Sequence, residues 1–233
     1  MCRLLRPLYG TKQGANKWYQ ELKKFFLEIG FTVSISNEAV FYQIISADRF
    51  IIVGVATDDF TIVASSQSVA NAFKTKLNNR FKIVDLGAIN WLLSMSIVRD
   101  YTNRTISLGQ EAFIEKVATR FDVHSMRPVS TPLEPAVDLS PDAPHVSAKF
   151  LSPSEKSRYR EIIGSIMYPA NMTRPDIMFS ISTLSQHLEA PRTTHLKAAN
   201  RVLSYLYATK NHRLVIGGKE PSVVGYSDSD WAS

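Results

Sequence analysis

The chain has 233 residues, of which 45% are hydrophobic and 21% charged, and this composition excludes a wholly disordered protein. The length suffices to bury a sizeable core in one large domain or two small ones. The net charge of +6 favours an anionic partner only weakly, since many basic proteins bind none.

The N-terminal part of the chain predicts a helix followed by extended segments. Asn16–Ile29 places its apolar side chains on one helical face, and Gly30 is a typical C-terminal helix signal. Phe31–Val33 and Ala39–Ile45 have the composition of extended structure. This segment therefore predicts an amphipathic helix that leads into a sheet.

An acidic turn between two apolar runs predicts a β-hairpin. Phe50–Ala56 is a continuous apolar run rich in β-branched residues, which is typical of a buried strand, and Phe60–Ala64 is a second strand. Thr57, Asp58 and Asp59 lie between them. The short spacing makes a hairpin with an acidic turn the natural interpretation.

The next segments complete a mixed domain. Ser66–Arg80 predicts a helix capped by Ser66 or Ser68. We predict three more strands and a helix from the apolar pattern, at Phe81–Val84, Trp91–Val98, Arg104–Leu108 and Gln110–Phe121. This order predicts an α+β domain, with helices on one face of an antiparallel sheet.

The composition changes at residues 127–155, which hold six of the eleven prolines. Proline at this density blocks helices and central strands, so the segment predicts a linker. Three helices are then predicted, at Ser154–Ala170, Asp176–Glu189 and Thr194–Thr209. Two short strands are predicted last, at Arg213–Ile216 and Val223–Ser227.

Several functional classes are excluded by composition. The single cysteine, Cys2, excludes a disulfide scaffold and a multi-cysteine zinc site, and it fits a reducing compartment. No apolar run reaches the roughly 18 residues that span a bilayer. The first residues also lack the apolar core of a secretory signal. We therefore expect an intracellular protein that is not secreted and has no membrane partner.

The positive charge is concentrated in two segments. Residues 1–24 contain six Lys or Arg residues and only one acidic residue, Glu21, and residues 191–219 contain six and no acid. One interpretation is that the segments form two walls of an anion-binding surface. The other is that each is a solvated helix face.

Asp58 and Asp59 are the sharpest chemical feature of the chain. Adjacent carboxylates repel each other unless cations neutralise them. Mg²⁺ prefers such hard oxygen ligands, and two metal ions on shared carboxylates stabilise the attacking and leaving oxygens of a phosphoryl transfer. The alternative is an ordinary exposed turn, because Asp is a favoured turn residue that needs no metal there.

Seven motifs in fixed order resemble one family. They are LRPLYGTKQGANKWY, VGVATDDFTIVAS, FKIVDLGAINWLLSMSI, VSTPL, YREIIGSIMYPANMTRPDIMFSIS, AANRVLSYLYATKNHRLVI and VGYSDSDWAS. Together they span essentially the whole chain, and they resemble the reverse transcriptase of copia-type LTR retrotransposons. Each motif is short, but the order of all seven is highly specific.

The resemblance implies a role for several residues. Asp58 and Asp59 match the aspartates of the Tyr-x-Asp-Asp hairpin, which hold the catalytic Mg²⁺ in this family. Lys12, Gln13 and Gly14 match a segment that contacts the incoming nucleotide and the template. The partners implied are an RNA template, a DNA primer, deoxynucleotides and the rest of the Pol polyprotein, in the cytoplasm (in a virus-like particle) or the nucleus.

The resemblance also implies a domain order. Residues 1–126 match a reverse transcriptase palm and fingers fragment, residues 127–153 the proline-rich linker, and residues 154–221 a helical thumb and connection region. Residues 222–233 resemble the first strand of a truncated RNase H domain. Asp228 matches the first metal-binding aspartate of that domain.

The chain departs from the family pattern at several positions. Ala56 stands where the hairpin tyrosine is usual, Thr57 replaces a small aliphatic residue, and Ser94 stands where Gly is usual. A further catalytic aspartate of the family lies upstream of the LYG segment, and residues 1–20 contain no acidic residue to replace it. Of the four RNase H carboxylates, only Asp228 and Asp230 have a counterpart.

These departures lead to two competing expectations. The first is a fragment of an RNA-directed DNA polymerase that is inactive as an isolated chain, because one metal-binding carboxylate is missing. The second is a non-enzymatic nucleic-acid-binding remnant of a transposable element, whose binding survives the loss of Asp58 and Asp59. Trp18, which has helical spacing with Phe25, is expected to lie in the core rather than to stack on bases.

Overall fold

A computed structural model describes residues 10–134, 139, 149–219 and 225. The chain divides into two compact units, Met1–Ile89 and Asn90–Ser233. The described residues form six α-helices and two antiparallel four-stranded sheets, which confirms the α+β class. Among these residues, no helix combines the length and the apolar character needed to cross a membrane.

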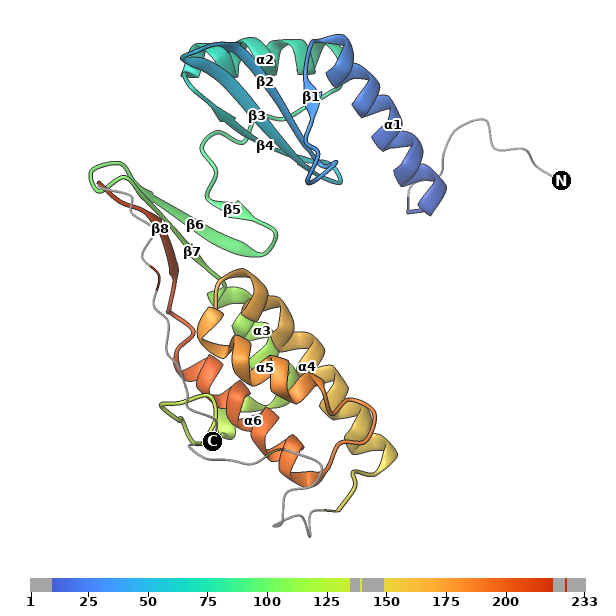
Figure 1. The fold of residues 1–233 in the computed structure, drawn as a ribbon, viewed down its shortest axis with the longest axis vertical. Helices are drawn as coiled ribbons and strands as arrows, with labels where there is room; N and C mark the ends of the chain where they lie inside the picture. Colours follow the sequence, from blue (N-terminus) through green and yellow to red (C-terminus); the bar gives the residue numbers. More distant parts are fainter. Residues whose placement is uncertain (1–9, 135–138, 140–148, 220–224, 226–233) are drawn as a thin grey trace, which may run out of the picture. The chain divides into compact units, whose positions relative to one another are not determined.

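The first unit is a four-stranded sheet with two helices. Its elements are α1 (Lys12–Glu28), β1 (Thr32–Val33), β2 (Val40–Ser46), β3 (Arg49–Ala56), β4 (Asp59–Ala64) and α2 (Gln67–Arg80). The strands follow one another in the order β1-β2-β3-β4, each antiparallel to the next. Both helices pack against the sheet through one shared core, so the predicted arrangement of helices on one face is confirmed here (Figure 1).

Local signals set the ends of both helices. Gly30 has a φ of +88°, a conformation that glycine adopts without strain, and it ends α1 as predicted. The Ser66 side chain accepts a hydrogen bond from the backbone N–H of Val69 and caps the start of α2. The end of α1 and the start of α2 therefore follow from the sequence, whereas α1 begins at Lys12 and not at the predicted Asn16.

Aromatic side chains form the core of the first unit. Phe26 of α1 is fully buried and stacks on Phe41 of β2, with ring centroids 4.3 Å apart. Two more rings pack around Phe26: Phe31, which precedes β1, at a centroid distance of 5.1 Å, and Phe73 of α2, at 5.7 Å. One side chain thus connects α1, the sheet and α2.

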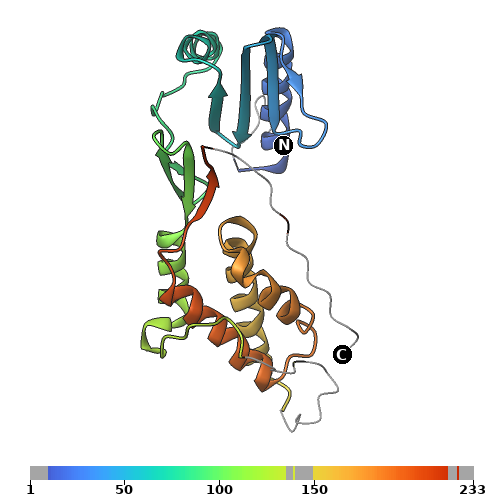
Figure 2. The same ribbon diagram turned by 60° about the vertical axis from the view of Figure 1, so that its left-hand side comes forward.

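The second unit combines a sheet with a group of helices. Its strands are β5 (Trp91–Leu92), β6 (Met95–Asp100), β7 (Thr105–Gly109) and β8 (Leu214–Gly217). Its helical elements are α3 (Glu111–Phe121), η1 (Val123–Ser125), α4 (Pro153–Met172), η2 (Pro175–Ile177), α5 (Met178–Ser185) and α6 (Thr193–Ala208). Strand β8 pairs with β7, so the strand that follows α6 lies beside strands from the first part of this unit (Figure 2).

Described parts of the proline-rich segment pack against these helices. Leu139 is 5% exposed and belongs to the same core as α3, α4, α5 and α6. The Ser204 hydroxyl of α6 donates a hydrogen bond to the Arg127 carbonyl at 2.6 Å. Within the described part of this segment, residues 127–134 form no helix or strand, as expected, but Leu139 and Leu151 are buried. The boundary between the two compact units along the chain falls after residue 89, whereas the sequence analysis placed its first domain boundary after residue 126.

Three predicted elements were wrong in detail. Phe81–Val84 forms no strand. Trp91–Val98 is not one strand but the hairpin of β5 and β6, closed by the pair Leu92 and Met95. Asp176–Glu189 is replaced by the 3-10 turn η2 and the shorter α5. The run has no Gly, Asn or Asp at positions 93 and 94 to mark the turn, so its apolar pattern alone predicted one strand.

The β5–β6 turn shows why glycine is usual at the position of Ser94. Leu93 and Ser94 both have positive φ angles, +47° and +61°, as in a type I′ turn, whose second position favours glycine. We predict that Ser94→Gly stabilises the second unit by roughly 0.5–1 kcal/mol, because relief of the left-handed strain exceeds the entropy cost of glycine. Thermal unfolding measures this change; a lower midpoint than wild type would contradict it.

His195 of α6 is buried, because only 2% of its surface is exposed. Its Nδ1 accepts a hydrogen bond from the backbone N–H of Arg192, and its Nε2 lies 3.0 Å from the Leu139 carbonyl. These contacts fit a neutral ring that carries its proton on Nε2. Burial lowers the pKa of His195, and the nearby His187, stacked at 4.0 Å, and Arg192 act in the same direction.

This neutral histidine makes the second unit sensitive to acid. The unfolded chain protonates His195 near the ordinary pKa of about 6.5, whereas the folded chain does so only at lower pH. The contribution of His195 to the free energy of unfolding is therefore fully present above about pH 6.5 and decreases as the pH falls below that value. We predict a smaller decrease in melting temperature between pH 7.5 and 5.5 for His195→Gln than for wild type. The exposed His212 gives the control, His212→Gln, which should keep the full decrease.

Candidate polymerase site

The Asp58–Asp59 pair lies at a tight turn of the first unit. Ala56 of β3 pairs with Asp59 of β4, so Thr57 and Asp58 are the two turn residues and the predicted hairpin is confirmed. Both aspartates are exposed at this end of the sheet. Thr57 has a φ of +55°, which is strained for a β-branched residue.

Trp18 connects helix α1 to this turn. Its indole N–H donates a hydrogen bond to the Thr57 carbonyl, with an N–O distance of 2.9 Å. Its ring packs edge-on against Phe81, at a centroid distance of 5.2 Å. Trp18 is thus half-buried against the core, as expected, but sequence reasoning missed its contact with the turn. The only available signal was that a buried indole N–H usually finds an acceptor.

Lys12, Gln13 and Gly14 form the first turn of α1. Lys12 and Gln13 are exposed, and the backbone N–H of Gly14 donates to the Thr11 hydroxyl at 3.0 Å, which caps the helix. These residues precede Trp18 by four to six positions, or about 6–9 Å along the helix axis. Helix α1 therefore carries the Lys12–Gly14 segment and, through Trp18, contacts the turn of Asp58.

The carboxylates fit Mg²⁺ in chemistry but not in number. Asp58 and Asp59 offer the hard oxygen donors that this ion prefers. Within the part of the chain that the structure describes, no group of three or more His, Cys, Asp or Glu residues is placed to hold a metal. A divalent ion at this turn would therefore need further oxygens from water, substrate or another carboxylate. Asp228 lies outside the described residues.

The two basic segments differ in how their cations are used. In α1, Lys12, Lys17 and Lys24 are exposed. In the second segment, Lys210 pairs with Glu115 at 2.6 Å and Arg201 with Glu134 at 3.3 Å. Arg213 forms an ion pair with Glu111 and donates to the carbonyls of Ser96 and Ser107, at 3.0 and 3.2 Å. Much of the second basic segment therefore stabilises its own unit, whereas α1 presents its charge to solvent.

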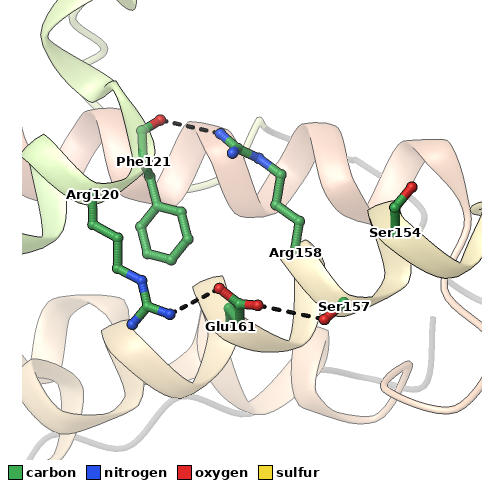
Figure 3. A pocket seen from close by; sticks show the side chains of 6 residues that line it. All are labelled: Arg120, Phe121, Ser154, Ser157, Arg158 and Glu161. Atoms are coloured by element: carbon green, nitrogen blue, oxygen red, sulfur yellow. Dashed lines mark hydrogen bonds and ion pairs between the residues drawn. The ribbon is translucent and has the colours of Figure 1, made fainter.

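A surface hollow of the second unit lies between α3 and α4 (Figure 3). Arg120 pairs with Glu161 at 2.8 Å across it, and Arg158 donates to the Phe121 carbonyl at 3.1 Å. Ser154 and Ser157 complete its lining. Its cations are engaged within the protein, so the hollow has the character of a packing seam between two helices.

The chain is similar in sequence to proteins of known families. A family model described as reverse transcriptase (RNA-dependent DNA polymerase) matches residues 1–135. The chain is 34% identical, over all its length, to the retrovirus-related Pol polyprotein from transposon TNT 1-94 of Nicotiana tabacum, and 33% identical to that from transposon RE1 of Arabidopsis thaliana. It covers 18% and 15% of these proteins.

A shorter relative is matched over most of its length. The putative transposon Ty5-1 protein of Saccharomyces cerevisiae is 30% identical over 95% of this chain and 70% of its own length. No solved structure matches the chain significantly. With its aspartate hairpin, the chain therefore belongs to the reverse transcriptase family of copia-type retrotransposon Pol polyproteins.

Proposed function

We propose that this chain supplies part of the polymerase site of a retrotransposon reverse transcriptase, which copies RNA into DNA by nucleotidyl transfer. The observation that carries the proposal is the exposed Asp58–Asp59 pair on a two-residue hairpin turn, in a chain of this family. The substrates by this proposal are an RNA template, a DNA primer and deoxynucleotides.

Each part of the site has a distinct role in this proposal. Asp58 and Asp59 hold the divalent metal, which stabilises the attacking primer hydroxyl and the leaving pyrophosphate. Lys12 and Gln13, exposed on the first turn of α1, bind the nucleotide or the template. The cationic face of α1 attracts the phosphate backbone.

The isolated chain is proposed to be inactive. The described residues supply two carboxylates at this turn and no third acidic or histidine ligand. A two-metal site that lacks one charged ligand loses several kcal/mol of transition-state stabilisation. Activity by this proposal requires another carboxylate from the Pol polyprotein.

The proposal also assigns a role to each part of the chain. Residues 1–126 serve as the palm and residues 154–221 as the thumb. Residues 222–233, with Asp228, begin the RNase H domain.

The test is a chimera in which this chain replaces the matching segment of the tobacco TNT 1-94 polyprotein. We predict that Asp58→Asn lowers primer extension on poly-rA by at least about a thousandfold, because a metal ligand is lost. Asp48→Asn is the matched control, since Asp48 is also exposed and lies in the turn at the opposite end of β3.

The control should keep activity within about twofold, because Asp48 lies outside the proposed site. Equal activity of Asp58→Asn and wild type in the chimera would overturn the proposed role of the carboxylates. Extension of a primer by the isolated chain, abolished by Asp58→Asn, would overturn its proposed inactivity.

A second candidate function is binding of nucleic acid without catalysis. The exposed Lys12, Lys17 and Lys24 of α1 favour it. It predicts that the isolated chain shifts RNA or DNA in a gel at 50 mM salt and far less at 200 mM, because counterions are released on binding. Binding unchanged in the double variant Asp58→Asn, Asp59→Asn supports it, whereas loss of binding in that variant excludes it.

A further inference from the structure

We propose that Trp18 is a positioning residue for the carboxylate turn. Its indole N–H fixes the strained Thr57 and so sets the direction in which Asp58 and Asp59 are presented. This inference rests on the proposed function only in that these carboxylates hold a metal. The conformational part concerns the turn itself and is tested independently.

The turn needs an external restraint because its own sequence disfavours it. Thr57 occupies the first turn position with a φ of +55°, where a two-residue hairpin turn normally places glycine. A β-branched residue in this region is strained, and such strain persists only when surrounding contacts over-determine the backbone. The contact with Trp18 joins this carbonyl to a residue 39 positions away in the sequence.

The core orients the indole that makes this contact. Phe81 packs edge-on against Trp18, and Phe25 of the buried core packs edge-on against Phe81, each at 5.2 Å. The indole N–H is therefore aimed before it meets the carbonyl. Next to it, the Tyr19 hydroxyl donates to the Glu38 carbonyl at 3.1 Å, which ties the same turn of α1 to the loop before β2.

The consequence concerns the spacing of the site. Helix α1 carries Lys12 and Gln13 as well as Trp18, so the hydrogen bond to Thr57 connects the helix of the proposed nucleotide-binding residues with the turn of the proposed metal ligands. Loss of the bond would let the turn leave its strained conformation. The two carboxylates would then change direction while the core remains packed.

The experiment uses the full chain and compares Trp18→Phe with Trp91→Phe. Phenylalanine keeps an aromatic ring against Phe81 but removes the N–H donor and part of the ring volume. Trp91, in the second unit, is the matched control for the same substitution. Circular dichroism verifies that both variants fold. NMR then measures the amide shifts and the ¹⁵N relaxation of Thr57, Asp58 and Asp59.

We expect Trp18→Phe to shift and mobilise these three amides and Trp91→Phe to leave them as in wild type. Adding Thr57→Gly to Trp18→Phe should return Asp58 and Asp59 toward their wild-type shifts, because glycine adopts the turn without strain. Loss of ring packing alone would not be rescued in this way. Unchanged turn amides in Trp18→Phe, or no rescue by glycine, would overturn the inference.

A Mn²⁺ titration of the same samples separates this inference from the proposed function. If the turn binds the ion, Trp18→Phe should weaken its affinity by about fivefold, the effect of one lost hydrogen bond. Equal affinity would contradict the positioning role. If wild type binds no Mn²⁺, the proposed metal site of the isolated chain fails, and the NMR comparison still decides whether Trp18 holds the turn.

Discussion

Replacing Arg174 with methionine is expected to destabilise the second unit by about 3–5 kcal/mol, because it leaves a partly buried carboxylate without its partner. Arg174 is 1% exposed and donates from Nε and Nη2 to the two carboxylate oxygens of Asp176, at 3.0 and 2.7 Å. It also donates to the carbonyl and the hydroxyl of Thr209, at 3.0 and 2.6 Å.

The surroundings of Asp176 explain the size of this effect. Burial acts to raise its pKa, but hydrogen bonds from Arg174 and from the Tyr205 hydroxyl hold the pKa below its ordinary value. The hydrogen bonds from Arg174 to Thr209 and from Tyr205 to Asp176 thus join η2 to the end of α6. Chemical denaturation with urea measures the loss of stability through the shift in midpoint.

Arg120→Met is the matched control for this prediction. Arg120 forms an ion pair of similar length with Glu161, but both side chains are about half exposed. Exposed pairs contribute about 0–1 kcal/mol, so this variant should unfold near the wild-type midpoint. Equal losses in the two variants would show that burial of the Arg174 pair does not decide its contribution.

Replacing Phe26 with alanine should destabilise the first unit by about 3–5 kcal/mol, because it opens a cavity in a fully buried aromatic cluster. The Phe26 ring has no exposed surface and contacts Phe41, Phe31 and Phe73. Its removal weakens the packing of α1 against the sheet and against α2. Hydrogen exchange of the β2 and β3 amides, read by mass spectrometry, measures the loss within this unit.

Leu27→Ala provides the control at the next position of the same helix. Leu27 is 51% exposed, so its truncation should change the stability by no more than about 0.5 kcal/mol. Both variants introduce alanine and raise helix propensity. A loss for Leu27→Ala as large as for Phe26→Ala would mean that burial in this cluster is not what stabilises the unit.

The structure also distinguishes the two basic segments from each other. In the sequence the two look alike, because each contains six Lys or Arg residues and at most one acidic residue. In space, Arg213 is surrounded by Glu111, Ser96 and Ser107, and Lys210 meets Glu115, although these partners lie about a hundred positions earlier in the chain. Lys12, Lys17 and Lys24 of α1 are exposed, so of the two segments α1 is the stronger candidate for contact with a phosphate backbone.

Local signals in the sequence determined much of the fold. The helical spacing of Leu22, Phe25 and Phe26, the cap at Ser66 and the left-handed Gly30 each act within a few residues, and all three were read correctly. The Asp58–Asp59 hairpin is equally local, because two apolar strands and a two-residue turn lie next to each other. The family likewise follows from motifs whose order the sequence alone displays.

Contacts between distant segments were decided only by the tertiary structure. His195 is an ordinary helix residue in sequence, but the fold brings it to Leu139, whose carbonyl accepts a hydrogen bond from its Nε2. Trp18 contacts the turn of Asp58 because a helix, a sheet and Phe81 converge there, and no spacing along the chain encodes that meeting. The sequence alone therefore singled out Asp58 and Asp59 and their local hairpin, whereas long-range packing decided how the turn that presents them is held.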